Sequence, residues 1–101
     1  MKKKTETLQQ KLEELYATRR RNLNLLIGVY RTIRNINQLV GRELTDTTWS
    51  QLRSGRPDKD GYVRPFSDKM ARELEEKLLL DRGWMDLPHQ SAEGVVRGRQ
   101  Q

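Results

Sequence analysis

The sequence predicts an all-α protein, a single domain of about five helices of which the first is extended. Three observations lead to this class. Apolar residues recur at steps of three and four along most of the chain, which is the period of an α-helix. Residues that cap helices precede several of these segments, and Gly or Pro follows them. The chain has 101 residues with 34% hydrophobic content, which is enough for one modest core.

The first expected helix spans residues 5–30, which contain no Pro and no Gly before Gly28. At its usual rise this helix is about 39 Å long, more than a compact domain of this size can cover. Residues 1–18 are therefore interpreted as a helical arm that either pairs with a second copy of the chain or is a solvated extension. The residues expected to form the pairing surface are Leu8, Leu12, Leu15 and Tyr16.

The middle of the chain has the pattern of a helix-turn-helix. A second helix is expected over residues 32–43, and Thr45 or Asp46 is expected to cap a third over about 46–54. Gly55 suits the C-terminal cap of that third helix. Two helices that follow one another across a short turn are the elements of a helix-turn-helix.

The helix over about 46–54 combines two kinds of face. Trp49 and Leu52 are apolar and three residues apart, so they can be buried together. Their neighbours carry hydroxyl, amide or guanidinium groups, which suit the edges of bases in a DNA major groove. The residues predicted to contact bases are Thr47, Thr48, Ser50, Gln51 and Arg53.

Glycine, proline and capping residues divide the rest of the chain. Trp49 and Trp84 are both expected in the core, and Arg72 and Glu75 are expected to form a structural pair on one helix. In chain order the elements are a loop over 55–66 with a tight turn at Asp60–Gly61 where a small β excursion is possible, a helix over 68–80 capped by Ser67, a short helical turn over 84–87, and a disordered tail over 89–101.

The positive charge of the chain is unevenly distributed. The net charge is +6, with seven Lys and Arg against three acids in residues 1–30, seven against four in 31–66, and six against seven in 67–101. A basic first two thirds favours a polyanionic partner. The residues predicted to contact phosphate are Arg19, Arg20, Arg21, Arg31, Arg34, Arg42, Arg56, Lys59 and Arg64.

The composition argues against several other classes of protein. The chain has no cysteine, so disulfides, thiolate zinc sites and a cysteine nucleophile are excluded. Asp46, Asp58 and Asp60 are scattered, and His89 has no partner in an organised motif, so we expect neither an enzyme, a metal site nor a cofactor. No segment is apolar enough for a membrane span or a signal peptide, so we expect a cytoplasmic protein.

Three segments resemble a known family. These are residues 21–23, residues 49–55, and above all residues 64–89, which contain Ala71-Arg72-x-x-Glu75 and Gly83-Trp84-Met85-Asp86. From Arg20 to His89 the chain resembles the phage-repressor-like helix-turn-helix proteins of the Cro/CI, or lambda-repressor-like, class. It departs from their pattern in the longer spacing between Gly41 and Ser50, in Trp49, in a long loop over 56–63 and in the added arm over 1–18.

This resemblance implies a lambda-repressor-like bundle over residues 19–88 that binds double-stranded DNA. It implies a sequence-specific transcriptional regulator of phage or prophage type, working as a homodimer in a bacterial nucleoid or an infected host cell. The helix over about 46–54 is then the recognition helix in the major groove. The alternative is an interaction protein on the same scaffold, such as an antitoxin or antirepressor, whose N-terminal helix binds a protein partner.

Overall fold

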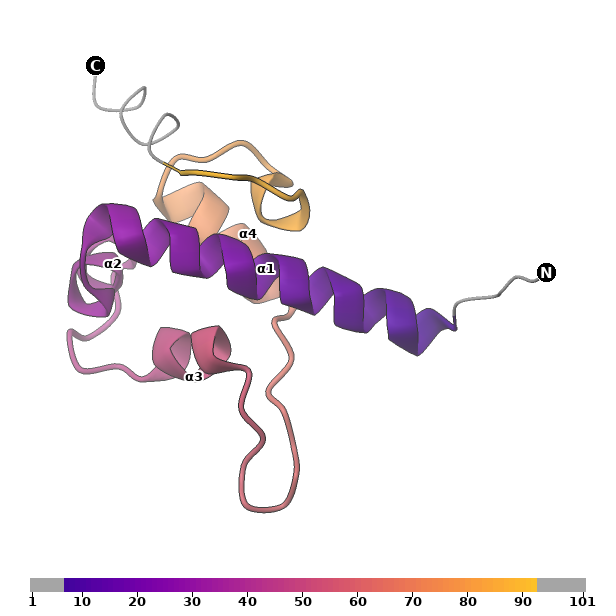
Figure 1. Ribbon diagram of the computed structural model, residues 1–101. Coiled ribbons are helices and arrows are strands. Elements are labelled where there is room, and N and C mark those ends of the chain that lie inside the picture. The colour runs from indigo at the N-terminus through magenta and orange to yellow at the C-terminus, as the bar shows by residue number, and fades with distance from the viewer. Residues whose placement is uncertain (1–6, 93–101) are drawn as a thin grey trace.

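The computed structural model describes residues 7–92, and within that range it contains helices and no strand. The all-α class is therefore confirmed, with four α-helices and one short 3-10 helix where about five helices were predicted. The elements are α1 (Leu8–Tyr30), α2 (Ile33–Val40), α3 (Thr48–Ser54), α4 (Asp68–Lys77) and the 3-10 helix η1 (Trp84–Asp86). Figure 1 shows α1 crossing the whole molecule, with α3 below its C-terminal half and α4 behind it.

Helix α1 begins later than predicted because Thr7 caps it. The Thr7 hydroxyl accepts a hydrogen bond from the Gln10 N–H, and the Gln10 side chain accepts one from the Thr7 N–H, which is a capping box. Residues 5 and 6 of the predicted helix lie outside the described range. The helix runs without a break to Tyr30, so the expected boundary between arm and domain at residues 18 and 19 falls inside a helix.

Helices α2 and α3 are both shorter than predicted. Thr32 caps α2, which ends at Val40 rather than at residue 43 because Gly41 adopts a left-handed conformation with φ of 82°. Helix α3 begins at Thr48, two residues later than expected, and the Asp46 carboxylate accepts a hydrogen bond from the Thr48 N–H at 2.7 Å. The N-cap residue of α3 is Thr47, whose side chain makes no capping hydrogen bond, and not Thr45 or Asp46 as predicted. Asp46, one residue earlier, nevertheless accepts from the first N–H of the helix.

Helix α4 starts where predicted and ends three residues early. The Ser67 hydroxyl accepts a hydrogen bond from the Met70 N–H, as its capping role requires. At the other end Leu79 has φ of 60°, and the N–H groups of Leu79 and Leu80 bond to the carbonyls of Glu76 and Glu75. This is a Schellman motif with leucine in the position that usually holds glycine.

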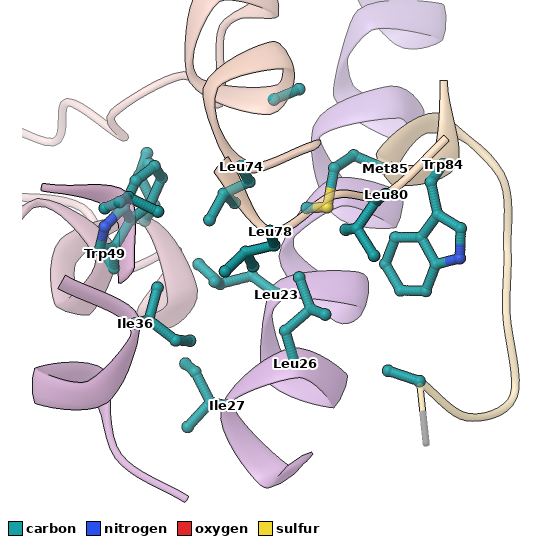
Figure 2. Packing of buried hydrophobic residues seen from close by; sticks show 14 of the residues in the cluster. Leu23, Leu26, Ile27, Ile36, Trp49, Leu74, Leu78, Leu80, Trp84 and Met85 are labelled. Carbon is teal, nitrogen blue, oxygen red and sulfur yellow. The ribbon is translucent and has the colours of Figure 1, made fainter. Parts of the chain in front are cut away.

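One cluster of buried side chains holds the helices together. Figure 2 shows Trp49 and Trp84 near opposite ends of this cluster, with aliphatic residues of α1, α2 and α4 between them. Both tryptophans are buried, which confirms their predicted place in the core. The centroids of the Trp49 and Phe66 rings are 6.4 Å apart, so the residue before the N-cap of α4 packs against α3. The core therefore fixes α3 from its inner side.

The segment after η1 packs back onto the core. The His89 ring stacks on Trp84 with centroids 4.0 Å apart, and Ala92 is buried. The predicted tail is therefore wrong for residues 89–92, since Trp84 offers these residues an aromatic surface. The remainder of that predicted tail, 93–101, lies outside the described residues.

Candidate nucleic-acid interface

Helix α3 is anchored through one face. Trp49 and Leu52 are buried against the bundle, as their spacing predicts. The opposite face, at steps of three and four, consists of the exposed residues Thr47, Ser50, Gln51 and Ser54. Four of the five residues predicted to contact bases are therefore exposed. They are Ser50, Gln51 and Arg53 on α3 and Thr47, which directly precedes the helix.

The exposed face of α3 differs from the predicted set of base contacts at Thr48 and Ser54. Thr48 is half-buried, and its hydroxyl accepts a weak hydrogen bond from Arg42 at 3.4 Å. Ser54, which sequence reasoning missed, is exposed on the same face as Ser50 and Gln51. Its position seven residues after Thr47 is the signal that could have identified it, because seven residues make two turns.

The connection between α2 and α3 is held by polar side chains from the interior. Asn37 is fully buried, and its amide donates to the carbonyls of Leu44 and Asp46 at 3.3 and 3.1 Å. Hydrogen bonds from the side chain and backbone of Thr48 hold the pKa of Asp46 below its usual value. Asn37 was not predicted, since buried polar residues on a helix give no periodic signal.

Arg42 is part of this connection rather than a free cation. Its guanidinium donates to Glu73 at 2.9 and 3.0 Å and lies 5.0 Å from the centroid of the Trp49 ring. The hydrogen bond to Glu73 is the main reason that its pKa is raised. The prediction that Arg42 contacts phosphate is therefore wrong, because its donors are directed at a carboxylate of α4.

Arg19 is the second correction among the predicted phosphate contacts. Its side chain is 2% exposed and donates to Asp86, Asp68 and the carbonyl of Phe66 at 2.7, 2.8 and 2.7 Å. Burial opposes its charge, but the hydrogen bonds to the two aspartates outweigh burial and raise its pKa. A guanidinium enclosed by protein acceptors cannot reach DNA.

The long loop after α3 forms a compact turn. The Asp58 carboxylate accepts hydrogen bonds from the N–H groups of Asp60 and Tyr62, both at 2.9 Å, and the Gly61 N–H donates to the Asp58 carbonyl. The tight turn predicted at Asp60–Gly61 is thus present, while the residues that the structure describes contain no strand there. Lys59 lies in this turn with its side chain exposed.

A direct bond joins the loop to α3. Arg64 donates to the Gln51 side-chain oxygen at 2.7 Å, and Gln51 donates in turn to the Thr47 hydroxyl at 3.3 Å. Arg56 and Arg64 border the same hollow of about 650 Å³ as Gln51 and Ser54. Cationic and hydrogen-bonding side chains therefore share one surface.

Arg20 brings a further cation from α1 to the end of α3. Its side chain passes so close to Gly55 that a Cβ atom on that residue would lie 2.8 Å from the Arg20 Nε. Among the described residues, Arg20, Arg56 and Arg64 thus surround the C-terminal end of α3. Arg21 on α1, Arg31 directly after α1 and Arg34 on α2 are also exposed.

The residues predicted to form a pairing surface lie along the N-terminal half of α1. Leu8 is 76% exposed and Leu12 is 39% exposed, while Leu15 and Tyr16 are half-buried. Tyr16 packs against the core cluster, and Leu12 and Tyr16 border the loop over residues 61–65.

The distal motifs serve packing. Glu75 accepts hydrogen bonds from the N–H groups of Gly83 and Met85, and Asn22 donates to the carbonyls of Met85 and Leu87. Arg72 donates to Glu75 at 3.1 Å, which confirms the predicted structural pair. These bonds fix η1 against α1 and α4.

Comparison of the chain with protein-family models, with curated proteins and with solved structures finds no significant match. Within residues 7–92, no helix is long and apolar enough to cross a membrane, and no three acidic or histidine side chains are grouped as a metal site requires.

Proposed function

We propose that this protein is a sequence-specific regulator of transcription that binds double-stranded DNA through a lambda-repressor-like helix-turn-helix, of phage or prophage type, as a homodimer. One observation carries the proposal. Helix α3 is anchored by Trp49 and Leu52, exposes hydroxyl and amide groups on its outer face, and ends among Arg20, Arg56 and Arg64. A short supported helix with cations at its margin suits a major groove about 12 Å wide.

Base recognition falls to the outer face of α3. Ser50 is exposed on it and Arg53 is exposed at its flank, and an arginine that meets guanine edge-on donates two hydrogen bonds to one base. Gln51 is held by Arg64 in the free protein. DNA binding frees Gln51 for a base when a phosphate oxygen replaces it as the acceptor for Arg64.

Phosphate contacts set the depth and register of α3. Arg20, Arg56, Lys59 and Arg64 come from α1 and from the loop, on either side of the helix end. Contacts to phosphate carry no sequence information by themselves but fix the protein on the duplex. Affinity therefore depends on this set, while sequence preference depends on α3.

Selection of bound duplexes from a random pool tests the proposal. We expect an enriched motif with two-fold symmetry, because a symmetric dimer presents the same helix twice. Arg53→Gln should relax the preference at one position in each half-site, and Arg82→Gln, an exposed change beyond α4, should leave the motif intact. A pool that shows no enriched sequence would falsify sequence-specific recognition.

A second candidate function rests on the apolar surface of the arm. Leu8 and Leu12 on α1 and Tyr62 and Val63 on the loop are all exposed, and such a patch suits a protein partner. In this alternative the chain is an antitoxin or antirepressor. The double variant Leu8→Glu, Leu12→Glu separates the two functions, because it should abolish capture of that partner while a monomer still binds a single half-site.

A further inference from the structure

The N-terminal half of α1 carries an apolar stripe that continues beyond the bundle. Leu8, Leu12 and Tyr16 are four residues apart, which places them along one side of the helix, and Leu23 lies further along that side in the core. The exposed part of the stripe is its beginning, since Leu8 and Leu12 are exposed and Leu23 is fully buried. The bundle therefore ends before the stripe does.

The loop after α3 covers one flank of this stripe and leaves the other open. Leu12 and Tyr16 border a hollow of about 580 Å³ together with Tyr62, Val63 and Pro65 of the loop. The exposed side chains of Tyr62 and Val63 extend the apolar surface away from α1. A second helix laid along Leu8 and Leu12 would meet α1 beneath it and the loop beside it.

We propose that this place is taken by the same segment of a second copy, with the two α1 helices antiparallel and the two-fold axis at Leu12. Leu8 and Tyr16 are equally distant from Leu12. In an antiparallel pair, Leu12 meets its own counterpart and Leu8 of each copy meets Tyr16 of the other. A surface that is complementary to itself in this way forms an isologous interface.

The spacing of the recognition helices supports the antiparallel pair over a parallel one, and this step rests on the proposed function. Leu23, at the part of α1 that faces α3, follows Leu12 by eleven residues, or about 16 Å of helix. A two-fold axis at Leu12 then separates the two α3 helices by about 33 Å along α1, close to the 34–36 Å between successive major grooves.

The direction of α3 also agrees. Arg20, which touches the end of α3, lies about 80° around α1 from Leu12 at 100° per residue. In an antiparallel pair the two-fold axis is perpendicular to the contact direction, so both α3 helices face the same side. In a parallel pair the axis runs along the helices, and the two α3 helices face opposite sides.

Disulfide trapping without DNA tests the interface, because the natural chain has no cysteine. Leu12→Cys should form a cross-linked dimer under mild oxidation, since the two positions meet at the axis. Leu39→Cys, an exposed leucine on α2, is the matched control and should stay mostly monomeric. Helical content by circular dichroism shows that each variant is folded.

Orientation is tested by pairing two variants. Leu8→Cys mixed with Tyr16→Cys should give the mixed disulfide, and Leu8→Cys alone should not cross-link. In an antiparallel pair the two cysteines at position 8, one from each copy, lie about 12 Å apart along the helix, which is too far for a disulfide. Cross-linking of Leu12→Cys no faster than Leu39→Cys overturns the interface, and efficient cross-linking of Leu8→Cys alone overturns its orientation. Dimers that form but do not bind DNA overturn the proposed function and leave the interface standing.

Discussion

At the scale of single residues, Leu79 is held in an unfavourable backbone conformation. Its φ is 60°, in the left-handed region, where a residue with a Cβ atom loses about 1 kcal/mol or more relative to glycine. The Schellman motif at the end of α4 requires this conformation, because it turns the N–H groups of Leu79 and Leu80 toward the last carbonyls of the helix.

Leu79→Gly should therefore stabilise the protein. The side chain is 62% exposed, so its removal sacrifices little packing, and we expect the free energy of unfolding to rise by about 0.5–1 kcal/mol. Urea denaturation followed by circular dichroism measures the change. Leu87→Gly is the matched control: it removes another exposed leucine where φ is −111°, so its stability should fall. A loss of stability in Leu79→Gly as well would contradict the backbone argument.

Arg19 is the residue on which the distal part of the fold depends most. Arg19→Met keeps the length of the side chain but removes the donor to the Phe66 carbonyl and one of the two arginines that donate to Asp86, the other being Arg72. We expect a loss of about 3 kcal/mol at pH 7, the usual cost of breaking a buried ion pair. Chemical denaturation of Arg19→Met beside Arg82→Met, which changes an exposed arginine, provides the comparison.

The pH dependence identifies the charge contribution to that loss. Partial burial tends to raise the pKa of Asp86, but hydrogen bonds from Arg19 and Arg72 outweigh it and hold the pKa below its usual value. The stabilisation is therefore complete above the unfolded pKa of about 3.9 and is lost as pH falls through the folded pKa. Arg19→Met should lose less stability on acidification than the natural protein. If the variant and the natural protein lost equal stability on acidification, the ion pair of Arg19 with Asp86 would not be the source of the acid dependence.

At the scale of elements, α3 ends at a glycine that also makes room for Arg20. Gly55 has φ of 63°, and a Cβ atom there would lie 2.8 Å from the Arg20 Nε and 3.0 Å from its Cδ. Gly61, in the loop, has φ of 83° and nothing within 4 Å of such a Cβ. The two glycines have similar backbone strain and differ in what surrounds them.

Gly55→Ala and Gly61→Ala should consequently differ in DNA binding. Each should lose about 1 kcal/mol of stability through the left-handed backbone. Only Gly55→Ala displaces Arg20, so we expect it alone to weaken DNA binding, by about fivefold for each lost contact, of which a symmetric dimer loses two. Fluorescence anisotropy with a labelled duplex measures the affinities. Equal affinity in the two variants would remove Arg20 from the phosphate contacts.

The helices themselves were largely predictable, and their ends were less so. Periodicity located all four helices, and Thr7, Thr32 and Ser67 are ordinary caps. The end of α4 was predicted three residues too late because the leucines at 78–80 continue the apolar pattern. The left-handed residue that ends the helix is Leu79, and glycine is the residue that usually marks such a position.

The candidate site was predictable to a similar degree. The spacing of Trp49 and Leu52 identified the buried face of α3, and hence its exposed one. The bond between Gln51 and Arg64 spans thirteen residues, and the bond between Arg19 and Asp86 spans sixty-seven. Contacts of that range depend on how the helices pack, which the period of a single helix does not determine.

At the scale of the whole molecule, the fold divides the cations into two groups. Arg19, Arg42 and Arg72 are bonded to carboxylates and hold helices together. Arg20, Arg56 and Arg64 gather near the end of α3, with Lys59 exposed in the adjoining loop. The net charge of +6 does not distinguish these groups, but the salt dependence of the proposed DNA binding should.

Each phosphate contact contributes about −0.9 to the slope of log affinity against log salt concentration. Four contacting cations in each copy give a dimer a slope of about −7. Arg56→Gln should make that slope shallower by about 2, because the symmetric dimer loses two contacts, whereas Arg82→Gln should leave it unchanged. Titration of the selected duplex between 50 and about 300 mM salt measures the slopes. A natural slope near zero would mean that the cations around α3 meet no phosphate, and the apolar arm would then remain as the functional surface.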